Sequence, residues 1–445
     1  MTQDADFSAL APPFKLGVGT SAYQIEGAVN QDGRGKSIWD VFTHTPGKTK
    51  DGTNGDVACD HYNRLNEDLD LLQWMHVDGY RFSISWPRIV PEGVGSVNEK
   101  GLDFYERLVD GLLARDITPY PTLYHWDLPA ALESEGGWLN RATCHAFEQY
   151  AVAVARRLGD RVPMWFTHNE PWCQAFLGYE HGIFAPGVQN FADALQCAHH
   201  LLLSHGMAAT ALRSVVNTPI GPALNFTPSY PGSDKEEDIE AAQRQNGYFQ
   251  GWFVDPIAGR GYPEHMVRHY GKLMPSFRSA DLDVIAAPID VLGVNYYERS
   301  LVVNKEGDEG GVLQLEHLQR PLAHTADREM YPPGLSDTLR DLHFNYGFNN
   351  LMITENGAAF EETPDETGYV DDAGRIDFIK AHLNEVIKVK AEGVPVNGYF
   401  AWTLMDNYEW NEGYSLCYGL CHMNKQTFKR TPKTSAHFLR RLRAK

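Results

Sequence analysis

The sequence of 445 residues predicts an α/β fold, a single (β/α)8 TIM barrel with elaborated βα loops that spans residues 1–445 as one domain. Segments with strand character alternate with segments of helical periodicity about eight times along the chain. No change of composition marks a linker between two domains. Such alternation is typical of a parallel sheet with crossover helices, and a count near eight favours a closed barrel.

An open, doubly wound sheet is the alternative to the barrel. Such a sheet usually carries a Gly-rich phosphate-binding turn after its first strand. The segment Gly17-Val18-Gly19 lacks the third glycine of that fingerprint, so we prefer the barrel. Residues 301–333, which are rich in charge and glycine, are expected to form an elaborated loop rather than a domain.

Eight segments are expected to be strands because apolar residues run or alternate and then stop at glycine, proline or polar residues. Residues 79–86, for example, alternate and end at Pro87, which cannot donate to a sheet ladder. The eight expected strands span residues 15–20, 79–86, 117–124, 163–167, 220–225, 291–297, 351–355 and 396–404.

The expected helices show apolar residues at helical spacing, as at Leu65, Leu69, Leu72 and Met75. Asn98 is a candidate cap for the second helix. These helices span residues 62–76, 98–115, 141–158, 191–216, 236–250, 334–344 and 376–390, with a last one starting at Lys433. After a turn at 21–28, residues 30–53 are expected to be a long loop that Trp39 and Phe42 anchor, since the segment is rich in Gly, Asp and Lys.

The composition excludes several classes of partner. The formal net charge is −19, which argues against a nucleic acid or an anionic membrane as partner. Aromatic residues make up 12% of the chain and would suit a site that stacks sugars, but composition alone is better explained by a large core rich in aromatics. The sequence does not indicate an oligomeric state.

The cysteines and the chain start bear on location. The six cysteines show neither a CxxC pair nor a dense framework, so we interpret them as mostly free thiols in a reducing compartment. Residues 1–6 are acidic and do not resemble a signal peptide. No stretch reaches the roughly 18 apolar residues of a membrane span. We therefore expect a soluble, cytoplasmic protein.

Two stretches end a strand on a glutamate. In residues 166–172, Glu170 follows an apolar strand that Pro171 stops, and in residues 351–357, Glu355 follows a strand that Gly357 breaks. Either stretch alone is explained more simply by a solvated loop glutamate. In a barrel, however, all parallel strands end on one face, so the two carboxyl groups would become neighbours.

Other polar and aromatic side chains follow the same expected strands, and core packing does not explain their convergence. Cleaving an acetal needs a protonated carboxyl for the leaving oxygen and an ionised one for the oxocarbenium-like centre. Arg81 and Tyr297 are suitable types to favour the ionised form of Glu355. The motifs of metalloproteases, P-loop enzymes and esterases are absent from the sequence. The strand-end residues are Gln24, Arg81, His125, Asn169, Glu170, Asn295, Tyr297, Glu355, Trp402, Glu409 and Trp410.

The sequence predicts no metal site and no cofactor. His199, His200 and His205 lie on one expected helix, but no further ligand stands at ligand spacing. A structural role for His125 is the alternative to a hydrogen bond with a polar substrate. Trp402 and Trp410 are interpreted as a sugar platform rather than core rings, because they flank polar residues.

These motifs together resemble glycoside hydrolase family 1, the β-glucosidase-type retaining enzymes, over nearly the whole chain. Each motif is modest alone, but their order and spacing are highly specific. They read Gln24-Ile25-Glu26-Gly27, Tyr80-Arg81-Phe82-Ser83-Ile84-Ser85-Trp86, His125-Trp126-Asp127-Leu128-Pro129, Thr167-His168-Asn169-Glu170-Pro171, Asn295-Tyr296-Tyr297, Ile353-Thr354-Glu355-Asn356-Gly357 and Asn407-Tyr408-Glu409-Trp410.

The resemblance implies that Glu170 is the general acid/base and Glu355 the nucleophile of a retaining mechanism, with their carboxyl groups about 5–5.5 Å apart. It also implies that Arg81 and Tyr297 tune the nucleophile. The residues that it implies for sugar binding are Gln24, His125, Asn169, Asn295, Tyr297, Trp402, Glu409 and Trp410, and those at the aglycone entrance are Trp172, Cys173 and Leu177.

The chain departs from the family pattern at one place. The usual Arg-Phe-Gly after the last tryptophan reads Cys417-Tyr418-Gly419, so the resemblance does not define this wall of the sugar pocket. Relatives that act on 6-phosphosugars carry Ser, Lys and Tyr where this chain has Glu409, Leu416 and Tyr418. An acidic Glu409 would repel a phosphate, so an unphosphorylated sugar is expected. Thioglucosidase relatives carry Gln at the position of Glu170, so the glutamate here argues against a thioglucosidase.

The resulting expectation is an exo-acting β-glucosidase that releases glucose from cello-oligosaccharides and aryl or alkyl β-glucosides with retention. The resemblance extends this to β-fucosides and β-galactosides. Its only expected partner is a small-molecule β-glucoside or oligosaccharide. A noncatalytic sugar-binding protein and an enzyme used mainly for transglycosylation are the alternatives, and two intact carboxylate motifs argue against the first.

Overall fold

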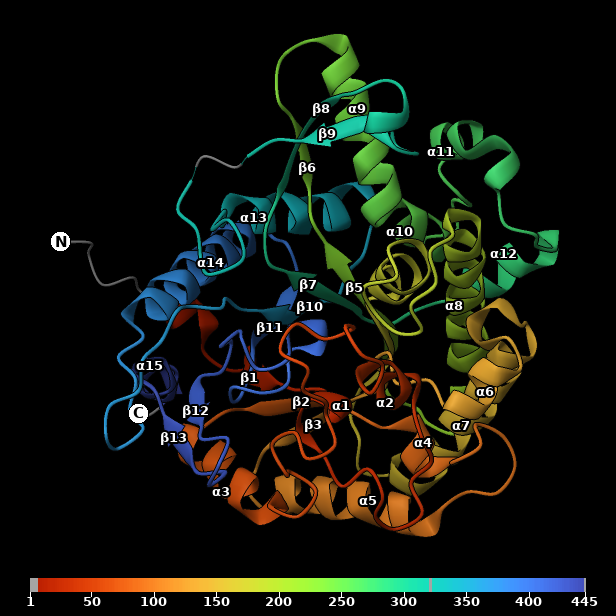
Figure 1. Cartoon of the computed structure of the whole chain (residues 1–445). Coiled ribbons are helices and arrows are strands. Elements are labelled where there is room, and N and C mark those ends of the chain that lie inside the picture. The colour runs from red at the N-terminus through yellow and green to blue at the C-terminus, as the bar shows by residue number, and fades with distance from the viewer. Residues whose placement is uncertain (1–6, 320–321, 444–445) are drawn as a thin grey trace.

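The computed structural model describes residues 7–319 and 322–443, and the acidic residues 1–6 lie outside this part. Eight parallel strands close into a barrel with helices outside it, which confirms the predicted (β/α)8 fold (Figure 1). In order around the barrel the strands are β1 (Lys15–Gly19), β2 (Gly79–Ser83), β3 (Thr118–Tyr124), β4 (Trp165–Asn169), β5 (Ile220–Phe226), β7 (Leu292–Tyr296), β10 (Leu351–Asn356) and β11 (Val396–Trp402).

The parallel register brings the strand ends to one level. Gly19 at the end of β1 pairs with Arg81 on β2 and with Trp402 on β11. Below this level, side chains from several strands fill the barrel, among them Tyr120, Phe166 and Phe400. Gly17 leaves room for the Phe400 ring, since a Cβ there would lie 2.5 Å from that ring. The barrel is therefore a packed core that is open to chemistry only at the strand ends.

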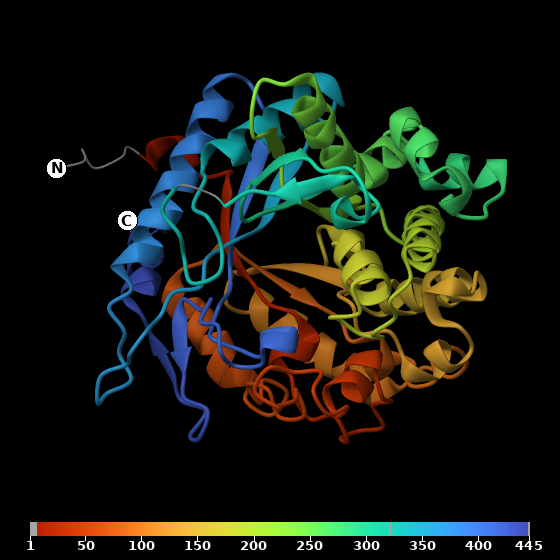
Figure 2. The same cartoon turned by 45° about the horizontal axis from the view of Figure 1, so that its top comes forward.

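The outer helices cover the barrel (Figure 2). They are amphipathic, as predicted: α5 buries Leu102, Tyr105, Leu108 and Leu112 on one face. The helices are α3 (Leu65–Met75), α5 (Glu99–Leu113), α7 (Ala142–Leu158), α8 (Phe191–Leu212), α9 (Glu236–Asn246), α10 (Trp252–Ile257), α11 (Glu264–Tyr270), α12 (Ser279–Ile285), α13 (Pro333–Arg340), α14 (Ala373–Ala391) and α15 (Thr434–Arg443).

Short elements decorate the strand-end face. They are the helices α1 (Ala22–Ile25), α2 (Ile38–Thr43), α4 (Trp86–Ile89) and α6 (Ala130–Ser134), a π-helical segment Cys173–Glu180, and the strand pair β12 (Cys421–Met423) and β13 (Arg430–Pro432). No helix in the described ranges is long and apolar enough to cross a membrane.

Two local predictions were wrong. Residues 30–53 contain the helix α2, which begins with a capping box: the side chains of Ser37 and Asp40 each accept from the other's backbone N–H. Trp39 and Phe42 are buried anchors, as expected, but they sit on this helix. Asn98 precedes α5, yet its side chain does not cap it, because its amide donates to the carbonyls of Asp32 and Arg88.

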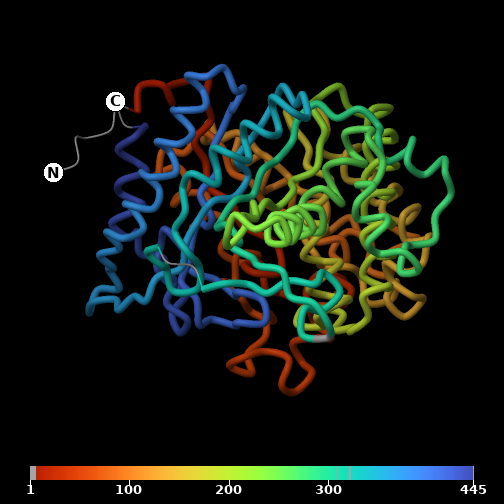
Figure 3. The backbone as a smooth tube through the Cα atoms, turned by 90° about the horizontal axis from the view of Figure 1, so that it is seen from above, coloured from red at the N-terminus to blue at the C-terminus, as the bar shows by residue number. Residues whose placement is uncertain are grey.

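The segment 301–333 carries more structure than the predicted loop. The strands β8 (Ser300–Asn304) and β9 (Leu315–His317) pair with β6 (Ser229–Pro231) in a small three-stranded sheet beside α9 (Figure 1). At the other side of the molecule the first and last described segments meet (Figure 3). There Arg443 donates to the carbonyls of Leu10 and Phe14, which ties α15 to the chain start.

Candidate active site

A cavity of about 420 Å³ lies at the strand ends and contains both glutamates that the sequence singled out. Glu170 and Glu355 line it, and both are buried, at 6% and 3% exposure. The other predicted residues on its surface are His125, Trp172, Cys173, Leu177, Asn295, Tyr297, Trp402, Glu409 and Trp410. Gln24, Arg81 and Asn169 do not line it, because they lie fully buried behind its wall and act through hydrogen bonds.

Glu355, on β10, is held by two donors. Arg81 Nη1 reaches its Oε1 at 2.6 Å, and the Tyr297 hydroxyl donates to its Oε2 at 2.7 Å. Burial, with the nearby carboxylates, raises the pKa of Tyr297 well above its ordinary value, so this hydroxyl keeps its proton. Both oxygens of Glu355 thus have a permanent donor, and a positive charge lies beside them.

Glu170 follows β4 and has a different environment. Asn295 Nδ2 donates to its Oε1 at 2.8 Å, and the Cys173 thiol donates to its Oε2 at 3.2 Å. Burial and the neighbouring Glu355 raise the pKa of Glu170 to about 7. The backbone of Glu170 has a φ of 45°, a strained conformation for a residue with a side chain, as is common at functional sites.

One hydrogen-bond chain joins the two carboxyl groups. Asn169 Oδ1 accepts from Arg81 Nη2 at 2.6 Å and from Asn295 Nδ2 at 2.9 Å. Arg81 also donates to Glu355 through its other nitrogen, Nη1, and Asn295 Nδ2 also donates to Glu170. Asn169 therefore fixes the relative placement of a carboxyl beside a cation and a carboxyl that binds its proton near neutral pH.

Glu409 and His125 present groups suited to sugar hydroxyls on the cavity surface, and each contacts a buried residue behind the wall. Gln24 Nε2 donates to Glu409 Oε2 at 3.0 Å, and Asn169 Nδ2 lies 3.2 Å from His125 Nε2. Burial lowers the pKa of His125 well below its ordinary value, so the ring is neutral, and burial raises the pKa of Glu409 to about 8. The His125 ring lies nearly parallel to those of Trp402 and Trp410, with centroids 5.8 and 5.9 Å away. Flat rings beside polar groups suit a sugar, because the rings can stack on its C–H faces while the polar groups bind its hydroxyls.

The predicted entrance residues form another wall. Trp172, Cys173 and Leu177 all line the cavity, and the Trp172 ring stacks on Phe249 at 4.1 Å between centroids. The three histidines considered as metal ligands do not line the cavity and serve the packing of α8. His199 contacts Tyr262 and Asp281, His200 contacts the Trp138 carbonyl, and His205 contacts Thr167.

Sequence reasoning missed Arg328, which lines the cavity from the segment 301–333. Its guanidinium lies over the Tyr297 ring, 4.8 Å from the centroid, and its Nε donates to the Tyr418 hydroxyl at 3.0 Å. Tyr418 in turn donates to Asp327. The segment has no periodicity that would have placed Arg328, whereas Tyr418 was flagged by the departure from the family pattern.

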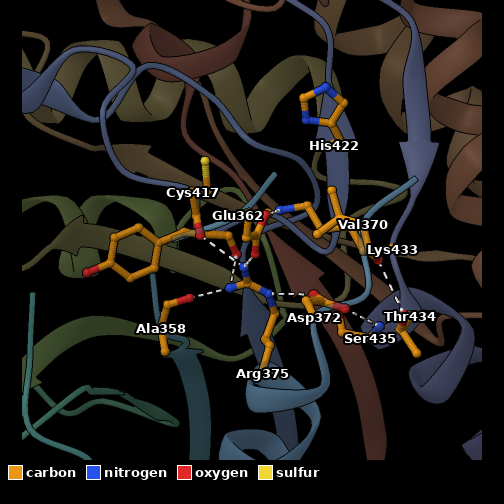
Figure 4. Close-up of polar contacts among 12 residues, drawn as sticks. Ala358, Glu362, Val370, Asp372, Arg375, Cys417, His422, Lys433, Thr434 and Ser435 are labelled. Carbon is orange, nitrogen blue, oxygen red and sulfur yellow. Dashed lines mark hydrogen bonds and ion pairs between the residues drawn. The ribbon is translucent and has the colours of Figure 1, made fainter. Parts of the chain in front are cut away.

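A buried ion network centres on Arg375 (Figure 4), which also donates to the carbonyl of Tyr418 at 3.4 Å. Arg375 pairs with Glu362 and with Asp372, and donates to the carbonyls of Ala358 and Cys417. Lys433, which is fully buried, pairs with Glu362 and, at 2.8 Å, with Asp406. Asp406 accepts from the N–H of Gly419. The network therefore fixes the loop that carries Tyr418.

The same network contains the one group of side chains in the described residues that is close enough to hold a metal ion, Glu362, Asp406 and Cys417. The Lys433 ammonium already pairs with both of these carboxylates. Arg375 adds a second cation at Glu362. The negative charge of the group is thus balanced by the protein's own cations.

A (β/α)8 barrel whose strand ends hold two buried carboxyl groups beside aromatic rings defines a glycoside hydrolase. Comparison with known proteins agrees. The family model for glycosyl hydrolase family 1 matches residues 8–445. The chain belongs to this family.

Close relatives and solved structures cover almost the entire chain. It is 43% identical to "Beta-glucosidase A" of Acetivibrio thermocellus over 96% of each chain. It is 44% identical to "Beta-glucosidase" of Agrobacterium sp. over 98% of this chain and 95% of the relative. The solved family 1 β-glucosidase from Thermotoga maritima superposes with a TM-score of 0.94 at 42% identity, covering 97% of both chains. The virulence factor SghA from Agrobacterium tumefaciens superposes with the same score at 44% identity, covering 97% of this chain and 96% of that one.

Proposed function

We propose that the protein is a retaining, exo-acting β-glucosidase that removes terminal nonreducing β-D-glucosyl residues from cello-oligosaccharides and from aryl and alkyl β-glucosides. The observation that carries this proposal is the contrast between two linked carboxyl groups in one cavity. Glu355 pairs with Arg81, whereas Glu170 has its pKa raised to about 7. Retaining glycosidases need this division between a nucleophile and a proton donor.

In the first step, a Glu355 oxygen attacks the anomeric carbon while Glu170 gives its proton to the leaving glycosidic oxygen. The bond between carbon and leaving oxygen breaks, the aglycone departs as an alcohol, and glucose remains as an ester on Glu355. In the second step, Glu170, now ionised, takes a proton from water. The hydroxide oxygen attacks the anomeric carbon, Glu355 is released, and the configuration of the substrate is restored.

The surrounding residues position these steps. Arg81 and Tyr297 orient Glu355 and offset its charge through the bonds described above. Glu409, which Gln24 holds, accepts hydrogen bonds from hydroxyls of the nonreducing sugar, and His125 and Asn295 contact that sugar from the same cavity. Asn169 contributes from behind the wall, through its contacts with His125 and Asn295, while Trp402 and Trp410 supply the stacking faces. Trp172, Cys173 and Leu177 contact the leaving group at the entrance.

An unphosphorylated sugar suits this pocket. Glu409 and Glu355 both line the cavity, and a 6-phosphate would bring up to two negative charges close to these carboxyl groups. The names of the relatives, β-glucosidases of several organisms, support glucose as the sugar. Activity on β-fucosides and β-galactosides, and a place in cellulose degradation, belong to the same proposal.

Two further expectations remain part of the proposal. We take residues 1–445 as one catalytic domain, because the strands from β1 to β11 close a single barrel and the residues that line its cavity run from His125 to Tyr418. The cytoplasmic location rests on the cysteines. All six are free thiols, and five of them are buried, which suits a reducing compartment.

The test is release of nitrophenol from 4-nitrophenyl β-glucoside and from its 6-phosphate, by the wild type and by Glu355→Gln. We expect hydrolysis of the plain glucoside, and a loss of at least about 1,000-fold in the variant, because the amide cannot form the ester intermediate. Activity on the phosphate alone would overturn the substrate class. Binding of glucosides without hydrolysis of either would overturn the enzymatic role, and more aglycone than glucose released at high substrate would indicate transglycosylation.

A further inference from the structure

The two oxygens of the Glu170 carboxyl have different partners. Oε1 accepts from the Asn295 amide, whose Nδ2 also donates to Asn169. Oε2 accepts only from the Cys173 thiol among the described residues, over 3.2 Å. The amide orientation of Asn295 is set by Thr354, whose hydroxyl donates to Asn295 Oδ1 at 2.6 Å.

The local chain path places Cys173 at this oxygen. Glu170 leaves the strand with a φ of 45°, Pro171 follows, and the N–H of Cys173 returns to the Glu170 carbonyl at 2.9 Å. This turn folds the side chain three residues later back over the carboxyl of Glu170. Cys173 is the first residue of the π-helical segment Cys173–Glu180, and the Trp172 ring packs on Phe249. These contacts hold the turn in place.

These partners decide which oxygen carries the proton. The Asn295 NH₂ group is a donor only, so Oε1 always accepts and the proton of the neutral acid resides on Oε2. A thiol is a weak donor and a weak acceptor. It can stabilise Oε2 when that oxygen is ionised, and giving up its bond costs little when Oε2 is protonated.

We propose that Cys173 is a positioning residue for Glu170: with Asn295 it fixes the plane of the carboxyl and assigns proton transfer to Oε2. This role rests on the proposed function of Glu170 as acid/base, and it adds to the place of Cys173 in the entrance wall. The groups that face Glu170 are Glu355 from β10, Tyr297 and Asn295 from the β7 end, Arg328 from 301–333, and Cys173 itself. Of these, Cys173 is the one that contacts Oε2.

The experiment measures kcat/KM against pH for phenyl β-glucoside, whose poor leaving group requires the acid, with Cys173→Ala and Cys173→Ser. Removing the donor disfavours ionised Glu170, so Cys173→Ala moves the alkaline limb of the profile upward by about 0.5–1 pH unit. The stronger hydroxyl donor of Cys173→Ser moves the limb downward. Because each variant has its own expected direction of shift, either variant alone tests the proposal if the other does not fold.

Cys144→Ala is the matched control. Cys144 is also a buried thiol that donates a hydrogen bond, to the His200 carbonyl, and it does not line the cavity. Its removal lowers thermal stability without moving the alkaline limb. If the Cys173 variants keep the wild-type limb, or shift it in the same direction as each other, the proposal is overturned.

A parallel measurement separates this proposal from the function on which it rests. Glu170→Ala is assayed on 2,4-dinitrophenyl β-glucoside, which needs no proton donor, with and without azide. Rescue by azide with formation of β-glucosyl azide identifies Glu170 as the acid/base, whatever the Cys173 variants do. If azide does not rescue Glu170→Ala and this variant keeps the pH profile of the wild type, the role of Glu170 itself is overturned.

Discussion

Arg81 and Glu355 form a fully buried ion pair of 2.6 Å at the strand ends of β2 and β10. The two residues are 274 positions apart in the chain, and only closure of the barrel brings them together. The same guanidinium reaches Asn169, so its position sets the geometry of the entire carboxylate site.

Arg81→Met is therefore expected to impair catalysis strongly. Removing one partner of a buried pair costs about 3–5 kcal/mol because the remaining charge is unpaired, which corresponds to roughly a 150- to 5,000-fold loss in kcat if the charge is needed in the transition state. The measurement is kcat on 4-nitrophenyl β-glucoside, with circular dichroism to verify folding. Arg157→Met, which removes a surface pair with Glu106, is the control and keeps wild-type kcat. A folded Arg81→Met with kcat within a few-fold of wild type would contradict the role of the pair.

The pH profile follows from the raised pKa of Glu170. The acid must be protonated to assist the leaving group, so kcat/KM falls as the pH rises through about 7. The fall is expected for phenyl β-glucoside and is weaker for 2,4-dinitrophenyl β-glucoside, whose leaving group needs no proton. Equal profiles for the two substrates would show that another group controls the alkaline limb.

Glu409→Gln is expected to lower activity and to raise the stability of the fold at alkaline pH. The folded pKa of about 8 lies above the ordinary 4.5, so the folded state binds the proton more tightly than the unfolded chain does. The free energy of unfolding therefore decreases as the pH rises from about 4.5 to 8, and this loss disappears when the carboxyl becomes an amide. At pH 8.5 the variant should melt about 2–4 °C above wild type, and at pH 4.5 the two should coincide. A variant that melts below wild type at pH 8.5 would contradict the assignment, while lower activity of the variant is expected at both pH values.

The ion network centred on Arg375 provides a stability prediction. Lys433→Met leaves Glu362 and Asp406 without their shared ammonium, and we expect a loss of about 3–5 kcal/mol in the free energy of unfolding (Figure 4). Adding Glu362→Gln removes one of the unpaired charges and should restore part of that loss. Denaturant unfolding of the single and double variants measures both effects. A double variant less stable than Lys433→Met would show that the charges are not coupled.

The sequence predicted the barrel because strand and helix periodicities are local and strong. It missed α2 because Gly, Asp and Lys dominate residues 30–53, although Ser37 and Asp40 form a readable capping box. It made Asn98 a candidate cap from residue type alone, and the structure uses that amide for tertiary bonds instead. The strand pairing of 301–333 with β6 is long-range and has no signal in a single segment.

For the site, strand-end position was the informative signal. It selected Glu170, Glu355 and Tyr297 from segments far apart in the chain, since parallel strands must end together. It could not separate residues that line the cavity from those behind the wall, such as Gln24, because depth depends on packing. Arg328 carried no signal at all, and the contact of Cys173 with Glu170 depends on a turn whose backbone conformation the sequence does not reveal.

The central claim is that Glu355 forms a covalent bond to glucose during turnover. It is tested by incubating the protein with 2,4-dinitrophenyl 2-deoxy-2-fluoro-β-glucoside, which forms the ester quickly and hydrolyses it slowly, followed by peptide mass spectrometry. We predict inactivation with one fluoroglucosyl adduct per chain, located on the peptide that contains Glu355. An adduct on Glu170, or steady turnover without any adduct, would contradict the assignment of the nucleophile.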